Sequence, residues 1–551
     1  MLFPLLFLAV FDTLLLDAIA APTVQLDNAV FTGAAMNGGL ISSFLGIPFA
    51  KPPIGDLRFR LPQPIPAYSG AHDATAFGPS CPQQSSGSKS ISGNLADDVL
   101  DTLDIADGFL LNDGSVRGSE QEDCLTINVI KPANATLTSK HPVVVWIFGG
   151  GFEGGGTSGY DGTVIVNRSI NLGTPIIYVS MNYRVAGFGF LGGKEVKAAG
   201  VGNIGLHDQR EALKWVKKYI GAFGGDHNKV TIWGQSAGAI SVALHMVANN
   251  GSHEGLFRGA FMQSGSHIPV GDITKGQKYY DAMVSLTGCS KASDTLACLR
   301  TVPYNTLKSA NDNASPGIFS YQSLILSWLP RPDGSFITDN PQKLLQQGKI
   351  ANIPVVSGLC DDEGTLFSLA QFNITNDAKF RAYIKEIYVP GANDSVVSKL
   401  AELYPDDVTA GSPFDTGTSN ALHSQFKRLA AFQGDGVFQA PRRFFLEERS
   451  GKQPIWAYLS KRVKAVPFVG SAHGVDVPNI YGGRDLTNYL VRFVVSLDPN
   501  GHSSIQWPKY TPSAPKILTL RSGRVVQTID DDTARKEAMS YLTRVTLENP
   551  I

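Results

Sequence analysis

The sequence predicts an α/β fold in which a large, mostly parallel β-sheet is flanked by helices, and three stretches of the chain support this prediction. Residues 229–233 are β-branched and aromatic, as a buried strand requires, and residues 237–249 after the next turn are small, aliphatic and helix-like. Residues 142–148 form a second strand-like run that ends in three glycines, and residues 353–358 form a third that ends in an acidic loop. Loops at the carboxyl ends of strands are where α/β sheets build their sites.

The turn between residues 229–233 and the following helix is Gly234-Gln235-Ser236-Ala237-Gly238. A Gly-x-Ser-x-Gly turn between a strand and a helix is the nucleophile elbow. Its glycines allow a turn too tight for side chains, so the serine hydroxyl projects above the sheet. The five-residue pattern is weak evidence alone, but the flanking strand and helix predict that Ser236 is a nucleophile.

The glycines after residues 142–148 predict an oxyanion hole. Gly149-Gly150-Gly151-Phe152 matches the glycine-rich loop that follows an early strand in esterases. Acyl transfer places negative charge on the former carbonyl oxygen, and N–H donors must be in place where that charge develops. We expect the amides of Gly150, Gly151 and Ala237 to be these donors. A plain turn is the alternative for the glycines, and the elbow later in the chain disfavours it.

A serine nucleophile needs a histidine base and a carboxylate that orients it, in the chain order Ser, acid, His in α/β-hydrolases. Of the ten histidines, His423, His473 and His502 lie well past the elbow. His473 is favoured because it lies in the flexible-looking loop Gly470-Ser471-Ala472-His473-Gly474.

The acid is predicted in the loop after residues 353–358, where Asp361, Asp362 and Glu363 follow one another. The residues themselves do not choose among the three carboxylates, and an ordinary acidic turn is the alternative for any one of them.

Further motifs are similar to the type-B carboxylesterase and lipase family of α/β-hydrolases, and the resemblance covers nearly all of the mature chain. Three stretches resemble the family's signatures: Gly46-Ile47-Pro48-Phe49-Ala50-Lys51-Pro52-Pro53 with Leu57-Arg58-Phe59-Arg60, Glu122-Asp123-Cys124-Leu125-Thr126-Ile127-Asn128-Val129, and Asn182-Tyr183-Arg184-Val185. Others resemble secreted fungal lipases of the Candida rugosa type: Leu329-Pro330-Arg331-Pro332-Asp333-Gly334, Ser412-Pro413-Phe414-Asp415-Thr416-Gly417 and Gln425-Phe426-Lys427-Arg428.

The resemblance implies a role for each candidate residue. Ser236 is the nucleophile, Glu363 the acid and His473 the base, and Ser264 lies where the family has a serine that supports the acid. Leu366 and Phe367 lie where related lipases line an acyl tunnel. The chain departs from the family at two positions: Gln235 replaces the usual Glu before the nucleophile, and Cys360 is an unexpected cysteine beside the acid.

The composition predicts one secreted catalytic domain. The 47 basic and 48 acidic residues nearly cancel, which disfavours nucleic acid or an anionic membrane surface as a partner. Residues 1–20 form an apolar leader that ends in an A-x-A cleavage pattern, although it lacks a basic start. Asp12 and Asp17 leave too few consecutive apolar residues for a membrane anchor. Without a linker, repeat or charge run to divide the chain, residues 21–551 are expected to form a single α/β-hydrolase domain.

Cysteines and glycosylation sequons agree with secretion. Five cysteines fit an oxidising compartment, and the family pattern implies the disulfides Cys81–Cys124 and Cys289–Cys298, with Cys360 left free. Six sequons are candidate glycosylation sites, namely Asn134, Asn167, Asn250, Asn313, Asn373 and Asn393.

The loop closed by Cys81 and Cys124 is a candidate lid because it is far longer than an ordinary connection. Its second half, from Leu95 to Leu110, spaces apolar residues three and four apart between aspartates, which predicts an amphipathic helix. Such a helix could open toward a lipid surface, or it could simply pack on the core. The loop contains no tryptophan, which disfavours a choline substrate.

Together these features predict a secreted serine hydrolase of carboxylic esters, with triacylglycerols as the favoured substrate. A carboxylesterase of soluble short-chain or sterol esters is the alternative. A non-catalytic adhesion member of the family is a remote one. We expect no metal or cofactor, no stable membrane anchor and no nucleic-acid partner. The expected partner is a lipid ester, at an interface, and the expected state is a monomer or weak homodimer.

Overall fold

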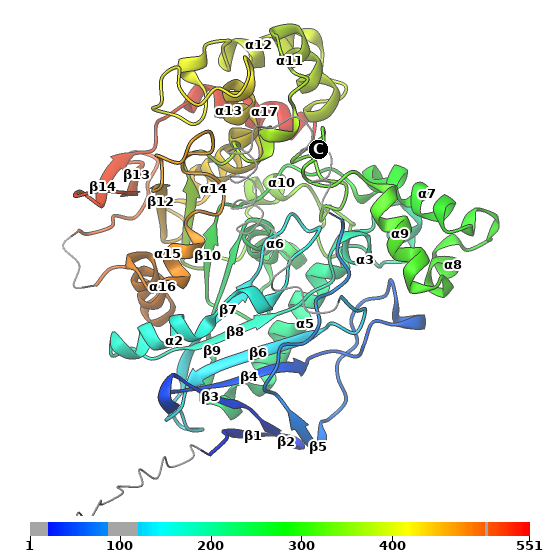
Figure 1. Cartoon of the computed structure of the whole chain (residues 1–551), viewed down its shortest axis with the longest axis vertical. Coiled ribbons are helices and arrows are strands. Elements are labelled where there is room, and N and C mark those ends of the chain that lie inside the picture. The colour runs from blue at the N-terminus through cyan, green and yellow to red at the C-terminus, as the bar shows by residue number, and fades with distance from the viewer. Residues whose placement is uncertain (1–19, 86–119, 502–504) are drawn as a thin grey trace, which may run out of the picture.

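The computed structural model describes residues 20–85, 120–501 and 505–551 (Figure 1). The predicted leader lies outside the described residues except for Ala20, and the amphipathic helix predicted within the 81–124 loop also lies outside them, as does His502. In the described part of the chain, no helix is long and apolar enough to cross a bilayer.

An eleven-stranded sheet passes through the centre of the molecule in the order β14-β13-β12-β11-β10-β9-β7-β8-β6-β4-β3. The neighbours from β13 to β8 pair in parallel, and pairs toward both edges are antiparallel, so the predicted α/β class is confirmed. The bounds are β3 (Ala34–Met36), β4 (Ile41–Pro48), β6 (Thr126–Pro132), β7 (His141–Ile147), β8 (Ile177–Met181), β9 (Gly225–Gln235), β10 (Gly259–Gln263), β11 (Val355–Cys360), β12 (Ile455–Lys461), β13 (Lys516–Arg521) and β14 (Gln527–Asp531).

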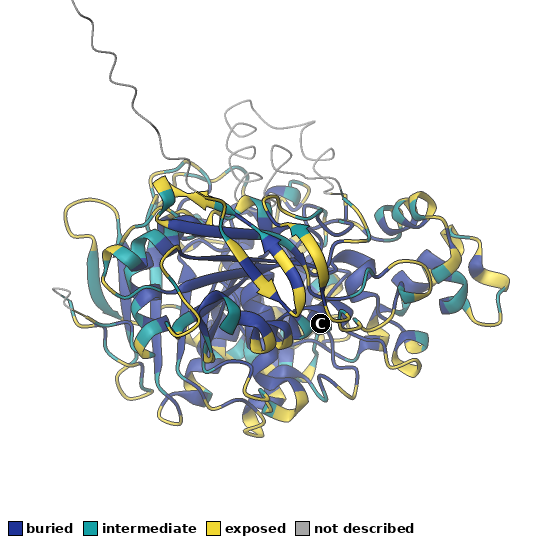
Figure 2. Cartoon of the chain, turned by 90° about the horizontal axis from the view of Figure 1, so that it is seen from below, coloured by how far each residue is buried: buried dark blue, intermediate teal, exposed yellow. Residues whose placement is uncertain are grey.

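Helices cover both faces of this sheet, which explains why its central strands are buried along their whole length rather than at alternate residues (Figures 1 and 2). One face is covered by α2 (Gly162–Asn171), α15 (Val477–Tyr481) and α16 (Asp485–Ser496), and the other by α5 (Ile204–Tyr219), α6 (Ala237–Gly251) and α10 (Pro341–Gln346).

The remaining elements lie around this layered core. A small sheet is formed by β1 (Thr23–Leu26), β2 (Asn28–Thr32) and β5 (Ser69–Asp73). The outer helices are α3 (Ala186–Phe190), α4 (Lys194–Ala198), α7 (Gln277–Leu286), α8 (Thr295–Thr301), α9 (Tyr304–Ala314), α11 (Asp377–Tyr383), α12 (Asp394–Leu403), α13 (Phe426–Gly434), α14 (Ala440–Arg449) and α17 (Lys536–Glu548).

Aromatic packing joins the sheet to one helical layer. Trp146 of β7 and Trp233 of β9 lie side by side with ring centroids 4.2 Å apart, and Tyr481 of α15 stacks on Trp233 at 5.4 Å. Trp233 also donates a 2.6 Å hydrogen bond to Gln263 of β10. These contacts fix β7, β9 and β10 relative to one another.

The register of the central strands brings their carboxyl ends together. Gly234 pairs with Ile147 of β7 and with Met262 of β10, and Gln263 pairs with Gly358 of β11. The loops that follow β7, β9, β10 and β11 therefore begin at one edge of the sheet, as expected for a site in an α/β protein.

Replacing Trp233 with Ala is expected to lower the free energy of unfolding by about 3–5 kcal/mol, because it leaves a cavity and removes the indole donor from Gln263 Oε1. Val525→Ala is the control, since Val525 is 63% exposed and should change stability by less than about 0.5 kcal/mol. Urea unfolding of both variants measures the difference. Equal stability would contradict the role given to the aromatic layer.

Candidate active site

Ser236 occupies a strained turn between β9 and α6, with φ 57° and ψ −127°. The turn is possible only because its flanking residues are glycines. A Cβ on Gly234 would lie 2.4 Å from the carbonyl of Gly238, and a Cβ on Gly238 would lie 2.0 Å from the carbonyl oxygen of Ile147. Strain of this kind clusters at functional sites. The predicted strand–turn–helix is therefore confirmed as a backbone feature.

His473 and Glu363 face each other in the loops after β12 and β11. His473 Nδ1 lies 2.5 Å from Glu363 Oε2, and both side chains are fully buried. The second oxygen, Oε1, accepts a 2.7 Å hydrogen bond from the amide of Cys360, which fixes the carboxylate plane. This geometry holds the imidazole in one orientation.

The other two carboxylates of the acidic loop have different partners. Asp361 forms an ion pair with Lys464 at 2.6 Å. Asp362 accepts hydrogen bonds from Lys464, Ser471 N, Ser412 Oγ and Phe414 N, and its backbone pairs with the loop that bears His473. Of the three candidates that the residues alone left open, the structure places Glu363 against His473.

The other described histidine candidate lies elsewhere. The ring of His423 packs against Phe372 and Phe426, and burial lowers its pKa to about 4. His423 therefore has an apolar environment and is separate from the Ser236 turn.

The outer nitrogen of the imidazole faces the elbow. His473 Nε2 lies 3.2 Å from Nε2 of Gln235, the residue before Ser236. A tautomer with its proton on Nδ1 would donate that proton to Glu363 and leave Nε2 free to accept one, as a general base requires.

The glycine loop lies directly over Ser236. Gly150 and Gly151 have φ values of 105° and 65°, which side chains rarely adopt, and a Cβ on Gly149 would lie 2.9 Å from Cβ of Ser236. Ala237 is the first residue of α6. The backbone of this loop can therefore approach a group bound at Ser236 without an intervening side chain.

An apolar pocket opens beside Ser236. Its lining includes Gly151, Ala237, Ile318, Phe367 and Phe438. The rings of Phe438 and Phe367 also lie 4.5 and 5.3 Å from the imidazole of His473. An acyl chain would fit this chemistry.

The two residues expected to line an acyl site separate in the structure. Phe367 lines the pocket, whereas Leu366 packs with Phe426, Val469 and Ala472 beside the His473 loop. Leu366 is the N-cap of a 3-10 helix that begins at Phe367, and successive residues of such a helix point about 120° apart, so these neighbours do not share a wall. Leu366 was expected to line the acyl site, but in the structure it packs beside the His473 loop and not in the pocket.

Ser264 and Cys360 form one buried unit next to Glu363. Ser264 Oγ donates to Cys360 Sγ at 3.9 Å, and the Cys360 amide is the group that binds Glu363. The link from Ser264 to the acid is thus indirect. Burial raises the pKa of the Cys360 thiol well above its usual value, which keeps the thiol unreactive.

Asp476 is a buried carboxyl that sequence reasoning did not identify. It accepts a 2.6 Å hydrogen bond from Tyr458, and burial, with a smaller contribution from the nearby Glu363 charge, raises its pKa. Its place three residues after His473 was the only signal available in the sequence.

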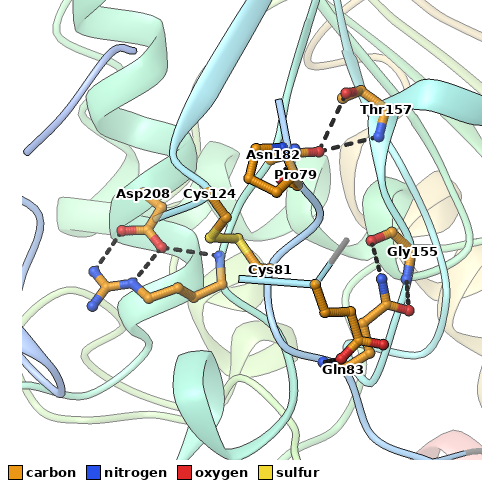
Figure 3. Close-up of a disulfide and its surroundings, with 10 residues drawn as sticks. Pro79, Cys81, Gln83, Cys124, Gly155, Thr157, Asn182 and Asp208 are labelled. Carbon is orange, nitrogen blue, oxygen red and sulfur yellow. Dashed lines mark hydrogen bonds and ion pairs between the residues drawn. A yellow bond between two sulfur atoms is a disulfide. The ribbon is translucent and has the colours of Figure 1, made fainter. Parts of the chain in front are cut away.

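Both expected disulfides are present, and one braces the glycine loop. Cys289–Cys298 joins neighbouring turns, while Cys81–Cys124 ties residues 79–85 to the start of β6 (Figure 3). Gln83 exchanges two hydrogen bonds with Gly155, of 3.0 and 3.1 Å. The disulfide thus supports the loop that lies over Ser236.

The candidate glycosylation sites differ in exposure. Asn134, Asn250, Asn313, Asn373 and Asn393 are exposed, whereas Asn167 is half-buried on α2 and its sequon serine, Ser169, is buried. Their glycosylation remains a prediction. Among the residues that the structure describes, no His, Cys, Asp and Glu side chains gather in groups able to hold a metal ion.

Comparison with known proteins agrees with this geometry. The family model described as "Carboxylesterase family" matches residues 20–538. The chain is 43% identical over 527 residues to Lipase 4 of Diutina rugosa, covering 92% of this chain and 93% of that protein. It is 44% identical over 522 residues to Secreted lipase 1 of Botryotinia fuckeliana, covering 91% and 89%. It is 41% identical over 541 residues to Secreted triacylglycerol lipase LIP1 of Gibberella zeae, covering 93% and 90%.

A solved structure shows the same architecture. The crystal structure of Aspergillus niger EstA matches with a TM-score of 0.81 at 28% identity, over 97% of this chain and 99% of that one. The chain belongs to the carboxylesterase family and has the α/β-hydrolase fold.

Proposed function

We propose that this protein is a secreted lipase that hydrolyses triacylglycerols through an acyl-enzyme on Ser236. The observation that carries the proposal is the buried 2.5 Å contact between His473 and Glu363, next to a strained serine that lines an apolar pocket. The relatives named as secreted lipases support the substrate class and the compartment. Two disulfides and the apolar leader support an oxidising, extracellular location.

In this mechanism, Ser236 Oγ attacks the ester carbonyl while His473 Nε2 takes its proton. For this step His473 Nε2 exchanges its contact with Gln235 for one with Ser236. Glu363 keeps the imidazole oriented and stabilises its charged form. The developing oxyanion is bound by the amides of Gly150, Gly151 and Ala237. Stabilisation of this charge is usually the largest single contribution to catalysis of acyl transfer.

The same residues complete the reaction by releasing the alcohol and then the fatty acid. His473 gives its proton to the leaving alcohol, and a water molecule, deprotonated by the imidazole, then attacks the acyl-enzyme and frees the fatty acid. The acyl chain would lie against Phe367, Phe438 and Ile318 in the pocket. Apart from the attacking water, every step uses groups of the chain itself.

Ser236→Ala is expected to lower kcat by about 10⁴-fold or more, because the nucleophile is lost while the rest of the site stays intact. Hydrolysis of a soluble butyrate ester measures the loss. Ser285→Ala, on the exposed surface of α7, is the matched control and should retain the wild-type rate. Full hydrolysis by Ser236→Ala would overturn the assignment.

Gln235→Glu is expected to move the acidic limb of the kcat/KM profile upward by about one pH unit. A carboxylate within hydrogen-bond reach of His473 favours the imidazolium, so the free base becomes available only at higher pH. Gln235→Met, which adds no charge, should leave the limb in place. An unshifted limb in Gln235→Glu would mean that residue 235 does not face the base.

Substrate form distinguishes a lipase from an esterase of soluble esters. Rates are measured on a medium-chain triglyceride through its solubility limit and on a soluble short-chain ester, with Ser236→Ala as the blank. A sharp rise once droplets form is expected for the lipase. Simple saturation below the limit would instead support the esterase alternative.

A further inference from the structure

A buried carboxyl lies within the glycine loop, and the mechanism above does not use it. Glu153 follows Phe152, and its side chain is only 3% exposed. The amides of Glu153 and Gly154 both donate to the carbonyl of Gly150 at 3.0 Å, which closes the turn that contains the two oxyanion glycines. The conformation of Glu153 and that of Gly150 are therefore set together.

The side chain of Glu153 reaches out of this loop to the pocket wall. Its Oε2 accepts a 2.9 Å hydrogen bond from the amide of Ile318. Ile318 lines the pocket, and its Cδ1 lies 3.0 Å from where a Cβ on Gly151 would stand. The Glu153 carboxyl thus joins the glycine loop to Ile318, the residue that packs against Gly151.

The backbone of Glu153 makes a third connection. Its carbonyl accepts a 2.7 Å hydrogen bond from the amide of Gln84, in the segment held by the Cys81–Cys124 disulfide and by the Gln83–Gly155 pair (Figure 3). Glu153 is therefore bound on one side to the disulfide-closed segment and on the other to the acyl pocket.

The remaining oxygen of Glu153 indicates its protonation state. Oε1 is buried without a partner among the described atoms. Burial raises the pKa of the carboxyl to about 8, opposed only by the Ile318 amide. Cations on two neighbouring segments already have carboxylate partners. Arg184, two residues before the amide that binds Phe152 O, is paired with Asp208, and Lys308 is paired with Asp312, which accepts from Ser85 N. Glu120, which accepts from Gln83 N, is itself an anion. An ionised Glu153 would thus be a buried charge without a counter-ion, which is costly.

We propose that Glu153, in its neutral form, is a positioning residue that holds the oxyanion amides of Gly150 and Gly151 in register with the acyl pocket. The inference rests on the proposed function, since it concerns the same site. Ionisation of Glu153 would draw water or rearrange the turn, and either change displaces the oxyanion donors. Activity should then fall at alkaline pH for a reason separate from the titration of the histidine base.

The test compares pH profiles of kcat for a soluble short-chain ester between pH 6 and 9.5. Glu153→Gln keeps the acceptor for the Ile318 amide but cannot ionise, so it should retain kcat at neutral pH. The ratio of wild-type to Glu153→Gln activity should fall about tenfold per pH unit above the pKa of Glu153. Glu153→Ala should lose about tenfold in kcat at neutral pH, less than the loss of a donor itself. Glu386→Gln, at an exposed position, is the control and should match wild type.

A stability measurement reports the ionisation directly. The folded state holds Glu153 neutral, whereas in the unfolded chain this carboxyl ionises near its ordinary pKa of 4.5. The stabilisation of the folded protein by neutral Glu153 is therefore complete below about pH 4.5 and is lost as the pH rises to about 8. Urea unfolding should therefore show wild type losing stability relative to Glu153→Gln across this window. An equal pH dependence of both proteins would show that Glu153 is not held neutral and would overturn the proposal.

The outcomes separate this inference from the proposed function. Parallel kcat profiles for wild type and Glu153→Gln, or full kcat in Glu153→Ala, would make Glu153 a merely structural residue while Ser236→Ala stays inactive. If Ser236→Ala hydrolyses the ester as fast as wild type, the proposed function itself fails.

Discussion

The whole site depends on one close approach of backbones, where the Ser236 turn meets the carboxyl end of β7. Gly238 lies so near the carbonyl of Ile147 that no side chain fits between them, and a Cβ on Gly149 would lie 2.9 Å from the Cβ of Ser236, which is also too close. Three strand ends converge here because β7, β9 and β10 are locked in register by Trp146, Trp233 and Gln263. The aromatic layer and the glycines together bring the glycine loop after β7 close to Ser236.

The ionisable side chains of the site are shielded from water. Glu363, His473, Asp476 and Glu153 are all nearly or fully buried, and each is held by hydrogen bonds from fixed backbone or side-chain groups. In such an environment electrostatic interactions are stronger than in water, and they need no reorganisation when charge develops. The same burial makes an unpaired charge costly, which is why the pKa values of Glu153 and Asp476 are raised. A carboxylic-ester hydrolase benefits from both effects, because its oxyanion forms in a dry, preorganised site.

What the sequence predicts well is local. The strand, turn and helix around Ser236 follow from β-branched residues, two glycines and an apolar helix, and each is found where expected. The pairing of Glu363 with His473 depends on tertiary contacts. The sequence does not distinguish the three neighbouring carboxylates, but in the structure Asp361 and Asp362 form ion pairs with Lys464, and Glu363 contacts His473. Leu366 and Phe367 likewise differ only in the direction that a helical turn gives them.

Glu153 and Asp476 show the limit of sequence reasoning most clearly. In the sequence Glu153 is a polar residue in a glycine-rich turn, and Asp476 is one aspartate in a loop. Their importance comes from burial beneath segments that are remote in the chain, such as Ile318 for Glu153 and Tyr458 for Asp476. No local pattern encodes such contacts. Residues 86–119 of the candidate lid, the loop closed by Cys81 and Cys124, lie outside the described residues, so the helix predicted there stays a prediction.

The most direct measurement is the covalent capture of the nucleophile. The folded protein is treated with an alkyl phosphonate ester, which phosphonylates activated serines, and the modified peptide is identified by mass spectrometry. The catalytic assignment predicts one adduct per chain on Ser236, with loss of activity in proportion, and no adduct after unfolding in urea, because the activation depends on the turn and on His473. No adduct on the folded protein, or an adduct on another serine, would contradict it.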